Sequence, residues 1–280
     1  MKRIVTIQDL SCVGKCSLTI ALPVLSALGL ECCALPTAVL SAHTAFDGFV
    51  REDLTDFLAP VSAHWQALGL QFDAIYTGYL ASPAQIDFVE DFFARFGGTD
   101  TLRFVDPVMA DQGKLYAGFD DDFPHLMRKL CAKADIITPN ITEACLLTGT
   151  PYRETHDERY LRTLLEKLLA LGPRSAILTG VRTQPGKMGV ASINAQGEIS
   201  MHLTQYIPAV FHGTGDLFAS VCVGLLSGGH TVEDAVRTAS DYVVQTLRVT
   251  AADPNARWYG VNYEATLPLL LRSLGAQEDL

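Results

Sequence analysis

Residues 74–105 read AIYTGYLASPAQIDFVEDFFARFGGTDTLRFV, and this stretch decides the fold class. It opens with a short apolar run at residues 74–77 and closes with a second one at residues 103–105. Between the two runs, residues 83–96 place Ile, Val and Phe side chains at helical spacing, so that they fall along one stripe. A strand, a helix and another strand in this order are typical of a parallel sheet that is covered by helices.

The same alternation continues on both sides of this unit. Helical spacing recurs in the last third, at residues 217–226, 232–249 and 265–274, and β-branched runs predict further strands at residues 4–7, 34–39, 136–138, 176–179 and 190–193. No linker of low complexity and no internal repeat divides the chain. We therefore expect a single three-layer α/β/α domain over residues 1–280 with a mostly parallel central sheet.

The composition narrows the class of protein. The 280 residues are 49% hydrophobic and 19% charged, which is enough apolar material for a buried core. Seven cysteines without a C-x-x-C pair predict reduced thiols rather than disulfides or a zinc site. The net charge of −10 argues against nucleic-acid and anionic-membrane partners. Because neither a membrane-spanning run nor a signal-peptide pattern is visible, we expect a cytoplasmic protein.

Polar groups directly follow five of the predicted strands. In open α/β sheets, ligands bind beyond the carboxyl ends of the strands, so these groups are expected to share one site. They are Gln8-Asp9, Thr77-Gly78-Tyr79, Asp106-Pro107, Thr138-Pro139-Asn140 and Thr179-Gly180.

The strongest local motif is Gly213-Thr214-Gly215-Asp216, immediately ahead of an apolar helix. The glycines let the backbone approach a ligand, and the helix N-terminus offers free N–H groups to an anion. A carboxylate at Asp216 can accept the proton of a substrate hydroxyl while the amides hold a transferred phosphate. An ordinary helix cap is the alternative interpretation, but two glycines ahead of a buried helix favour function.

Three oxygen-bearing side chains suit a hydrated Mg²⁺. Asp106 follows a strand, and Asn140 and Glu143 share a face at the start of a predicted helix. Taken singly, a turn aspartate and a capping pair would explain them as well. Gly14-Lys15-Cys16-Ser17 looks like the end of a P-loop, but its first glycine would fall at Asp9 and its Ser/Thr position holds Cys16. We therefore set it aside as a phosphate site.

Aromatic groups near the strand ends can orient a planar ligand. His43-Thr44 lies in a polar break, and Tyr79 and Tyr116 lie close to glycines, so the His and Tyr rings can stack on a ring. A purely structural role for each of them is the alternative.

Together these motifs resemble the ribokinase-like superfamily, and within it the pyridoxal/pyridoxamine kinases along the whole chain. The combination of His43-Thr44 with Thr77-Gly78-Tyr79 favours this vitamin B6 branch. The resembling stretches are IQDLS at residues 7–11, SAHT at 41–44, YTGY at 76–79, DPVMAD at 106–111, IITPN at 136–140 and GTGDLF at 213–218.

The resemblance implies ATP-dependent phosphorylation of the 5′-hydroxymethyl group of pyridoxal, pyridoxamine or pyridoxine, and a homodimer. Asp216 would be the general base, and the amides of Gly213, Thr214 and Gly215 would form the anion hole. Mg²⁺–ATP, and in some relatives K⁺, would be the cofactors, with Asp106 and Glu143 at the metal. Asn140, Thr179, Gly180 and Thr214 would contact ATP; Asp9, Ser11, His43, Thr44, Tyr79 and Tyr116 would line the vitamer pocket, Tyr116 from a covering flap.

Two alternatives stay open. Hydroxymethylpyrimidine kinases and other ribokinase-like kinases of small alcohols share the fold and the motifs. A non-catalytic B6-binding protein is the alternative of another class, although a pure binder needs neither a base nor metal ligands.

Overall fold

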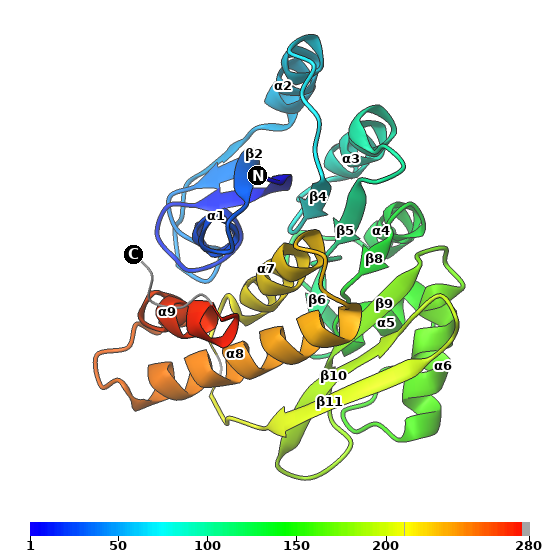
Figure 1. Cartoon of the computed structure of the whole chain (residues 1–280), viewed down its shortest axis with the longest axis vertical. Helices are drawn as coiled ribbons and strands as arrows, with labels where there is room; N and C mark the ends of the chain where they lie inside the picture. The colour runs from blue at the N-terminus through cyan, green and yellow to red at the C-terminus, as the bar shows by residue number, and fades with distance from the viewer. Residues whose placement is uncertain (210, 276–280) are drawn as a thin grey trace.

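A nine-stranded sheet forms the middle layer of the protein, whose computed structural model describes residues 1–209 and 211–275 (Figure 1). The strands follow one another in the spatial order β11-β10-β9-β8-β5-β4-β1-β2-β3. Their bounds are β1 Arg3–Ser11, β2 Glu31–Leu40, β3 Arg51–Asp53, β4 Ala74–Thr77, β5 Leu102–Val105, β8 Ile136–Ile137, β9 Ser175–Val181, β10 Lys187–Ile193 and β11 Ile199–Gln205. The short strands β6 (Ala110–Asp111) and β7 (Lys114–Leu115) form a separate hairpin.

The sheet is parallel from β2 through β1, β4, β5 and β8 to β9. Antiparallel pairs add β3 at one edge and β10 and β11 at the other. The predicted α/β/α architecture is therefore confirmed. Each predicted strand coincides with an observed one, whereas β3, β6, β7 and β11 were not predicted. The sequence of β3 is Arg-Glu-Asp, three exposed residues, and it gives no apolar signal.

Helices cover both faces of the sheet because its strands alternate their side chains. In β1, Val5 and Ile7 belong to one core cluster and Ile4 to the other. The first cluster lies under α2 (Thr55–Ala67), α3 (Pro83–Phe96), α4 (Phe123–Ala132), α5 (Ile141–Thr148) and α6 (Glu158–Leu169). The second lies under α1 (Leu18–Ala27), α7 (Thr214–Ser227), α8 (Val232–Ala252) and α9 (Tyr263–Ser273). The predicted apolar stripe of α3 is buried in the first cluster.

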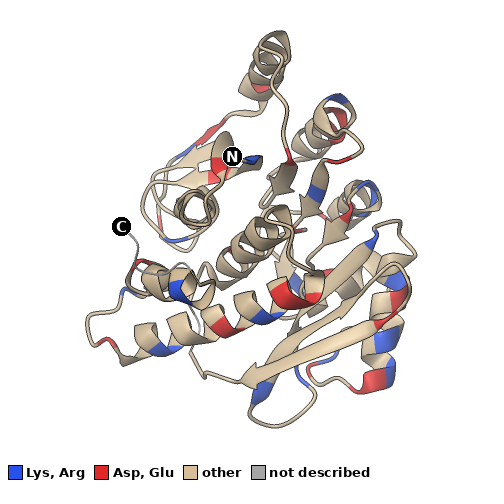
Figure 2. Cartoon of the chain, viewed as in Figure 1, with Lys and Arg blue, Asp and Glu red and all other residues tan. Residues whose placement is uncertain are grey.

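The positions of the charged residues and the state of the cysteines agree with what the composition predicts. Lys, Arg, Asp and Glu are prominent along the outer helices α6 and α8 (Figure 2). All seven cysteines are free thiols, as predicted. Among the described residues, no helix combines the length and the apolar character that crossing a membrane requires.

Candidate active site

The carboxyl ends of five parallel strands meet at one edge of the sheet, as predicted. The Gly78 N–H donates to the Ile7 carbonyl, which joins the end of β4 to β1. The Asp106 N–H donates to Thr77 and the Thr138 N–H to Val105, so the ends of β4, β5 and β8 also lie side by side. The Thr179 N–H donates to the Pro139 carbonyl, which adds β9. The polar groups at these strand ends therefore face one region. Gln8-Asp9 and Thr179-Gly180 were predicted to follow their strands, but they lie within the last residues of β1 and β9, because both strands extend further than their apolar runs.

The GTGD motif forms the start of α7. Gly213 has φ 83°, and a Cβ there would collide with the Lys15 carbonyl oxygen, so both its conformation and its surroundings require glycine. Asp216 lies in the first turn and stays partly accessible. Burial raises the pKa of its carboxyl to about 6. The nearby Ser17 backbone N–H opposes this rise, and the charge of Asp9 adds to it.

Four carboxyl groups influence one another at this edge. Burial raises the pKa of Asp106 well above its usual value, and the charges of Glu143 and Asp216 raise it further. Burial also raises the pKa of Glu143 to about 8, against the effect of the backbone N–H groups that it accepts. Burial is again the main reason why the pKa of Asp9 is raised. Such a group of carboxyls with raised pKa values is typical of a catalytic site.

Asn140 and Glu143 form a capping box at the start of α5. The Asn140 side chain accepts from the Glu143 N–H at 2.9 Å, and Glu143 Oε2 accepts from the Asn140 N–H at 2.8 Å. The other carboxylate oxygen, Oε1, accepts from the Met109 N–H at 3.0 Å. Asn140 Nδ2 donates to the Ala110 carbonyl at 2.7 Å. Both side chains therefore attach the β6–β7 hairpin to α5.

The predicted flap residue Tyr116 directly follows the β6–β7 hairpin and lies near the acidic edge, the sheet edge that holds Asp9, Asp106, Glu143 and Asp216. The Tyr116 N–H donates to the Met109 carbonyl, and the ring is 42% exposed. Burial of its hydroxyl, together with the charges of Glu143, Asp111 and Asp106, raises the pKa of Tyr116. Tyr79 packs against Phe119 with ring centroids 5.6 Å apart; burial raises the pKa of Tyr79, and the charge of Asp9 adds to this rise. Both tyrosines therefore lie close to the predicted site.

His43 lies within an aromatic cluster that sequence reasoning missed. Its Nδ1 accepts from the Ala45 N–H and its Nε2 lies 3.0 Å from the Tyr259 carbonyl, which favours the neutral ring with the proton on Nε2. The His212 ring, directly before Gly213, lies 4.6 Å from the His43 ring. The rings of Phe46, Trp258 and Tyr259 belong to the same cluster. The neighbouring Thr44 is exposed.

Asp9 faces hydroxyl groups of its own loop. Ser17 Oγ donates to Asp9 Oδ1 at 2.5 Å, and Ser11 Oγ donates to Oδ2 at 3.1 Å. All three side chains are buried. Ser17 was not a predicted site residue, although it ends the P-loop-like motif that was set aside.

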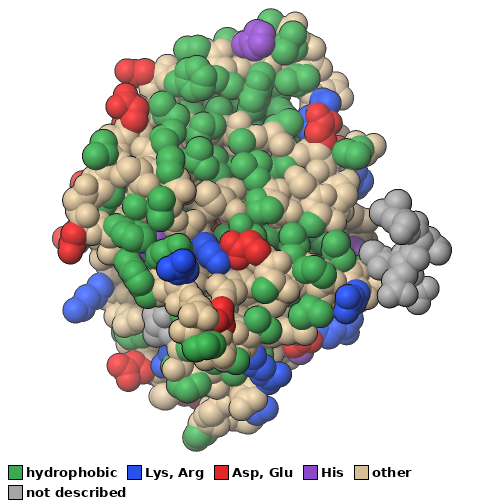
Figure 3. Space-filling model, turned by 90° about the vertical axis from the view of Figure 1, so that its left-hand side faces the viewer, with side chains coloured by type: hydrophobic (Ala, Val, Ile, Leu, Met, Phe, Trp, Pro, Cys, Tyr) green, Lys and Arg blue, Asp and Glu red, His purple; other side chains and the backbone are tan. Residues whose placement is uncertain are grey.

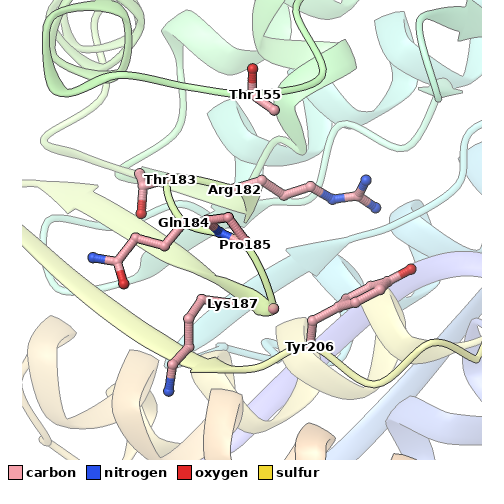
Figure 4. A pocket seen from close by; sticks show the side chains of 8 residues that line it. Thr155, Arg182, Thr183, Gln184, Pro185, Lys187 and Tyr206 are labelled. Carbon is pink, nitrogen blue, oxygen red and sulfur yellow. The ribbon is translucent and has the colours of Figure 1, made fainter.

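A hollow of about 280 Å³ lies just beyond Thr179 and Gly180, at the turn between β9 and β10 (Figure 4). Figure 4 shows the Arg182 and Tyr206 side chains extending in the same direction, and the guanidinium lies 5.3 Å from the tyrosine ring centroid. The hollow does not include Asp216. Its lining is Thr155, Arg182, Thr183, Gln184, Pro185, Gly186, Lys187 and Tyr206.

A parallel α/β/α sheet with a glycine-rich helix start and buried carboxyls at its carboxyl edge defines a small-molecule kinase of the ribokinase-like class. The chain belongs to the phosphomethylpyrimidine kinase family, whose model matches residues 22–261. The resemblance to the pyridoxal kinase branch is confirmed by named relatives. One is the pyridoxine/pyridoxal/pyridoxamine kinase of Bordetella avium, 30% identical over 88% of this chain and 85% of that protein.

Two solved structures extend the match to the whole fold. The pyridoxal kinase of Lactobacillus plantarum is 34% identical, with a TM-score of 0.91 over 99% of both chains. A Bacteroides thetaiotaomicron protein described as a phosphomethylpyrimidine kinase was crystallised with pyridoxal. It is 41% identical, with a TM-score of 0.91 over 96% of this chain and 95% of that one.

Proposed function

We propose that the protein transfers the γ-phosphoryl group of ATP to the 5′-hydroxymethyl group of a vitamin B6 vitamer. One observation carries the proposal: Asp216, with its pKa raised to about 6, lies in the first turn of a helix whose glycine-rich start has free backbone N–H groups. A carboxylate with such a pKa is ionised at neutral pH and is a stronger base than an exposed aspartate. The named relatives support the choice of a B6 vitamer.

In the proposed reaction, Asp216 accepts the hydroxyl proton as the oxygen attacks. The amides of Gly213, Thr214 and Gly215 stabilise the negative charge on the transferred group. Asp106 would hold a Mg²⁺, which when bound neutralises phosphate charge. The donor set fits, because a single buried carboxylate suits an ion that takes its other ligands from water and phosphate. Among residues 1–209 and 211–275, no group of three acidic, His or Cys side chains forms a preorganised metal cage.

Glu143 would assist the metal site mainly by holding the flap, because its two oxygens already accept backbone N–H groups. Asn140, Thr179, Gly180 and Thr214 would contact the phosphates. We assign the hollow beyond Gly180 to the nucleoside part of ATP, since Arg182 and Tyr206 offer a cation and an aromatic ring beside the phosphate end. The vitamer ring would contact Asp9, Ser11, His43, Thr44, Tyr79 and Tyr116.

We also propose a cytoplasmic homodimer formed by the whole chain as one domain. The dimer is supported by Figure 3, which shows the side of the molecule where β2, α1 and α9 lie. Hydrophobic side chains are prominent on the upper half of this side. Light scattering on the purified protein tests the dimer: a mass near twice 30.4 kDa is expected, and a monomer at micromolar concentration contradicts it. A K⁺ requirement rests on the resemblance alone and is tested by exchanging K⁺ for Na⁺.

The deciding experiment compares pyridoxal, pyridoxamine, pyridoxine and hydroxymethylpyrimidine under identical ATP and Mg²⁺ conditions. The family name keeps the pyrimidine as the second candidate substrate. Higher kcat/KM for any B6 vitamer supports the proposal and identifies the preferred one. Turnover of the pyrimidine alone keeps the mechanism and replaces the substrate, whereas vitamer binding without phosphoryl transfer identifies a non-catalytic binding protein.

A further inference from the structure

Ser17 has a backbone conformation that a serine rarely adopts. It is the N-cap residue of α1, with φ 47° and ψ −128°, and its side chain caps no N–H group of the helix. An N-cap serine normally has an extended backbone and uses its hydroxyl as the cap. The observed angles are close to those of the first central residue of a type II′ turn, a position dominated by glycine. Something other than local preference therefore holds Ser17 in this conformation.

The hydroxyl of Ser17 is bound to Asp9 instead. Ser17 Oγ donates to Asp9 Oδ1 at 2.5 Å, and both side chains are 5% exposed. Asp9 itself is fixed by the hydroxyl of Ser11 at 3.1 Å and by its place in β1. A buried hydrogen bond between a hydroxyl and a carboxylate is stronger than a neutral one, so it can offset backbone strain.

The segment that contains Ser17 lies against the GTGD motif. The Ser17 N–H is close enough to the Asp216 carboxylate to oppose the rise of its pKa. Two residues earlier, the Lys15 carbonyl packs so closely on Gly213 that no side chain fits there. The loop is held from outside as well, because Lys15 Nζ donates to Asn262 and Glu264 near the start of α9. The P-loop-like segment at residues 14–17 therefore contacts the proposed base rather than a phosphate.

We propose that Asp9 and Ser17 are positioning residues for the catalytic base: Asp9 holds Ser17 in its left-handed conformation, and the Ser17 amide fixes the Asp216 carboxylate for the substrate hydroxyl. This inference rests on the proposed role of Asp216 and deepens it. It assigns Asp9 a function beyond contact with the vitamer ring. It also explains why a serine occupies a position that favours glycine, since its hydroxyl binds Asp9 of β1.

The test compares two substitutions of the same residue. Ser17→Ala removes the hydroxyl but keeps a β-carbon, so the left-handed conformation loses its support. Ser17→Gly also removes the hydroxyl, but glycine adopts this conformation without strain. We expect kcat to fall by about 10- to 100-fold in Ser17→Ala, with the KM values for vitamer and ATP within about twofold. In Ser17→Gly, kcat should return to within about threefold of the wild type.

Controls separate positioning from folding. Ser240→Ala removes another buried hydroxyl, one bonded to the Val236 carbonyl within α8, and should leave kcat unchanged. Thermal unfolding of all three variants shows whether a loss of kcat follows a loss of stability. Equal kcat in Ser17→Ala and Ser17→Gly, or wild-type kcat in Ser17→Ala, would overturn the inference.

The proposed function and this inference can fail separately. If the wild type phosphorylates no B6 vitamer, the proposed function fails, and crystal structures of the two Ser17 variants still decide the inference. We expect residue 17 to leave the left-handed region and the Asp216 carboxylate to move in Ser17→Ala, and both to stay in place in Ser17→Gly. An unmoved Asp216 in Ser17→Ala refutes the positioning role.

Discussion

Replacing Asp216 by asparagine should abolish most activity and at the same time stabilise the fold. Asparagine has nearly the same shape but accepts no proton from the substrate hydroxyl, so we expect kcat to fall by about 10² or more. The KM for the vitamer should change little, because Asp216 acts on the hydroxyl during transfer rather than on the ring. The stability gain follows from the charge that Asp216 carries inside the protein.

The sign and size of that gain come from the raised pKa. The carboxyl titrates near pH 6 in the folded protein and near 3.8 in the unfolded chain, so the folded state binds its proton more tightly. The contribution of this carboxyl to stability is therefore fully present below about pH 4, is lost as the pH rises to about 6, and does not change further above that pH. A rise of this size corresponds to about 3 kcal/mol, which is an upper bound because Asp216 is partly accessible. The asparagine variant avoids this cost.

Urea unfolding at pH 4.5 and at pH 8, together with initial rates of phosphate transfer, checks both effects. We expect the unfolding free energy of Asp216→Asn to exceed that of the wild type at pH 8 and the difference to shrink at pH 4.5. Asp87→Asn, which removes an exposed carboxylate on α3, is the matched control and should change neither quantity. A variant that keeps near-normal kcat removes Asp216 from the role of base. A variant that is less stable at pH 8 refutes the electrostatic reasoning.

Three further predictions test the site around the base. The kcat of the wild type should rise with pH through about 6 and level off above it, so that kcat at pH 5 is about a tenth of the plateau value. The residual kcat of Asp216→Asn should not show this rise with pH. Glu143→Gln leaves one side-chain oxygen where two now accept backbone N–H groups, so kcat should fall about tenfold and limited proteolysis of residues 109–116 should become faster. A fall in kcat without faster cleavage would place Glu143 at the metal alone. Arg182→Ala should raise the KM for ATP about fivefold and leave the KM for the vitamer unchanged, and Arg162→Ala, which changes an exposed arginine on α6, is the control. An unchanged KM for ATP contradicts the assignment of the hollow to the nucleoside part of ATP.

The fold could be predicted because its signals are local. Each predicted strand is a short apolar run, and α3 shows its buried stripe within 14 residues. The strands that escaped prediction lack such a signal. The β3 strand is three charged residues, and β11 is half-buried because one side of it faces solvent at the sheet edge. Their positions follow from pairing with β2 and β10 rather than from their own sequences.

The site residues at strand ends could be predicted from the sequence, whereas those brought in by other segments could not. Asp106, Asn140 and Thr179 could be placed together because parallel strands end at one edge. The cluster around His43 brings in rings at positions 212 and 258, which no pattern in the sequence connects to it. Ser17 looked like the end of a P-loop, since its unusual backbone depends on Asp9 and on the packing of residue 15 against Gly213.

The acidic edge explains how an anionic protein can accept an anionic nucleotide. Asp9, Asp106, Glu143 and Asp216 all have raised pKa values, mainly because they are buried, so negative charge on them is unfavourable. A nucleotide without a cation would be repelled by these charges, whereas a Mg²⁺-bound nucleotide brings the positive charge that they lack. The Glu143 oxygens already accept backbone N–H groups, and Asp216 is the proposed base, which leaves Asp106 as the carboxylate most available to a metal. Binding of Mg²⁺–ATP should therefore stabilise the fold more at pH 8 than at pH 5, because more of these carboxyls are ionised at the higher pH.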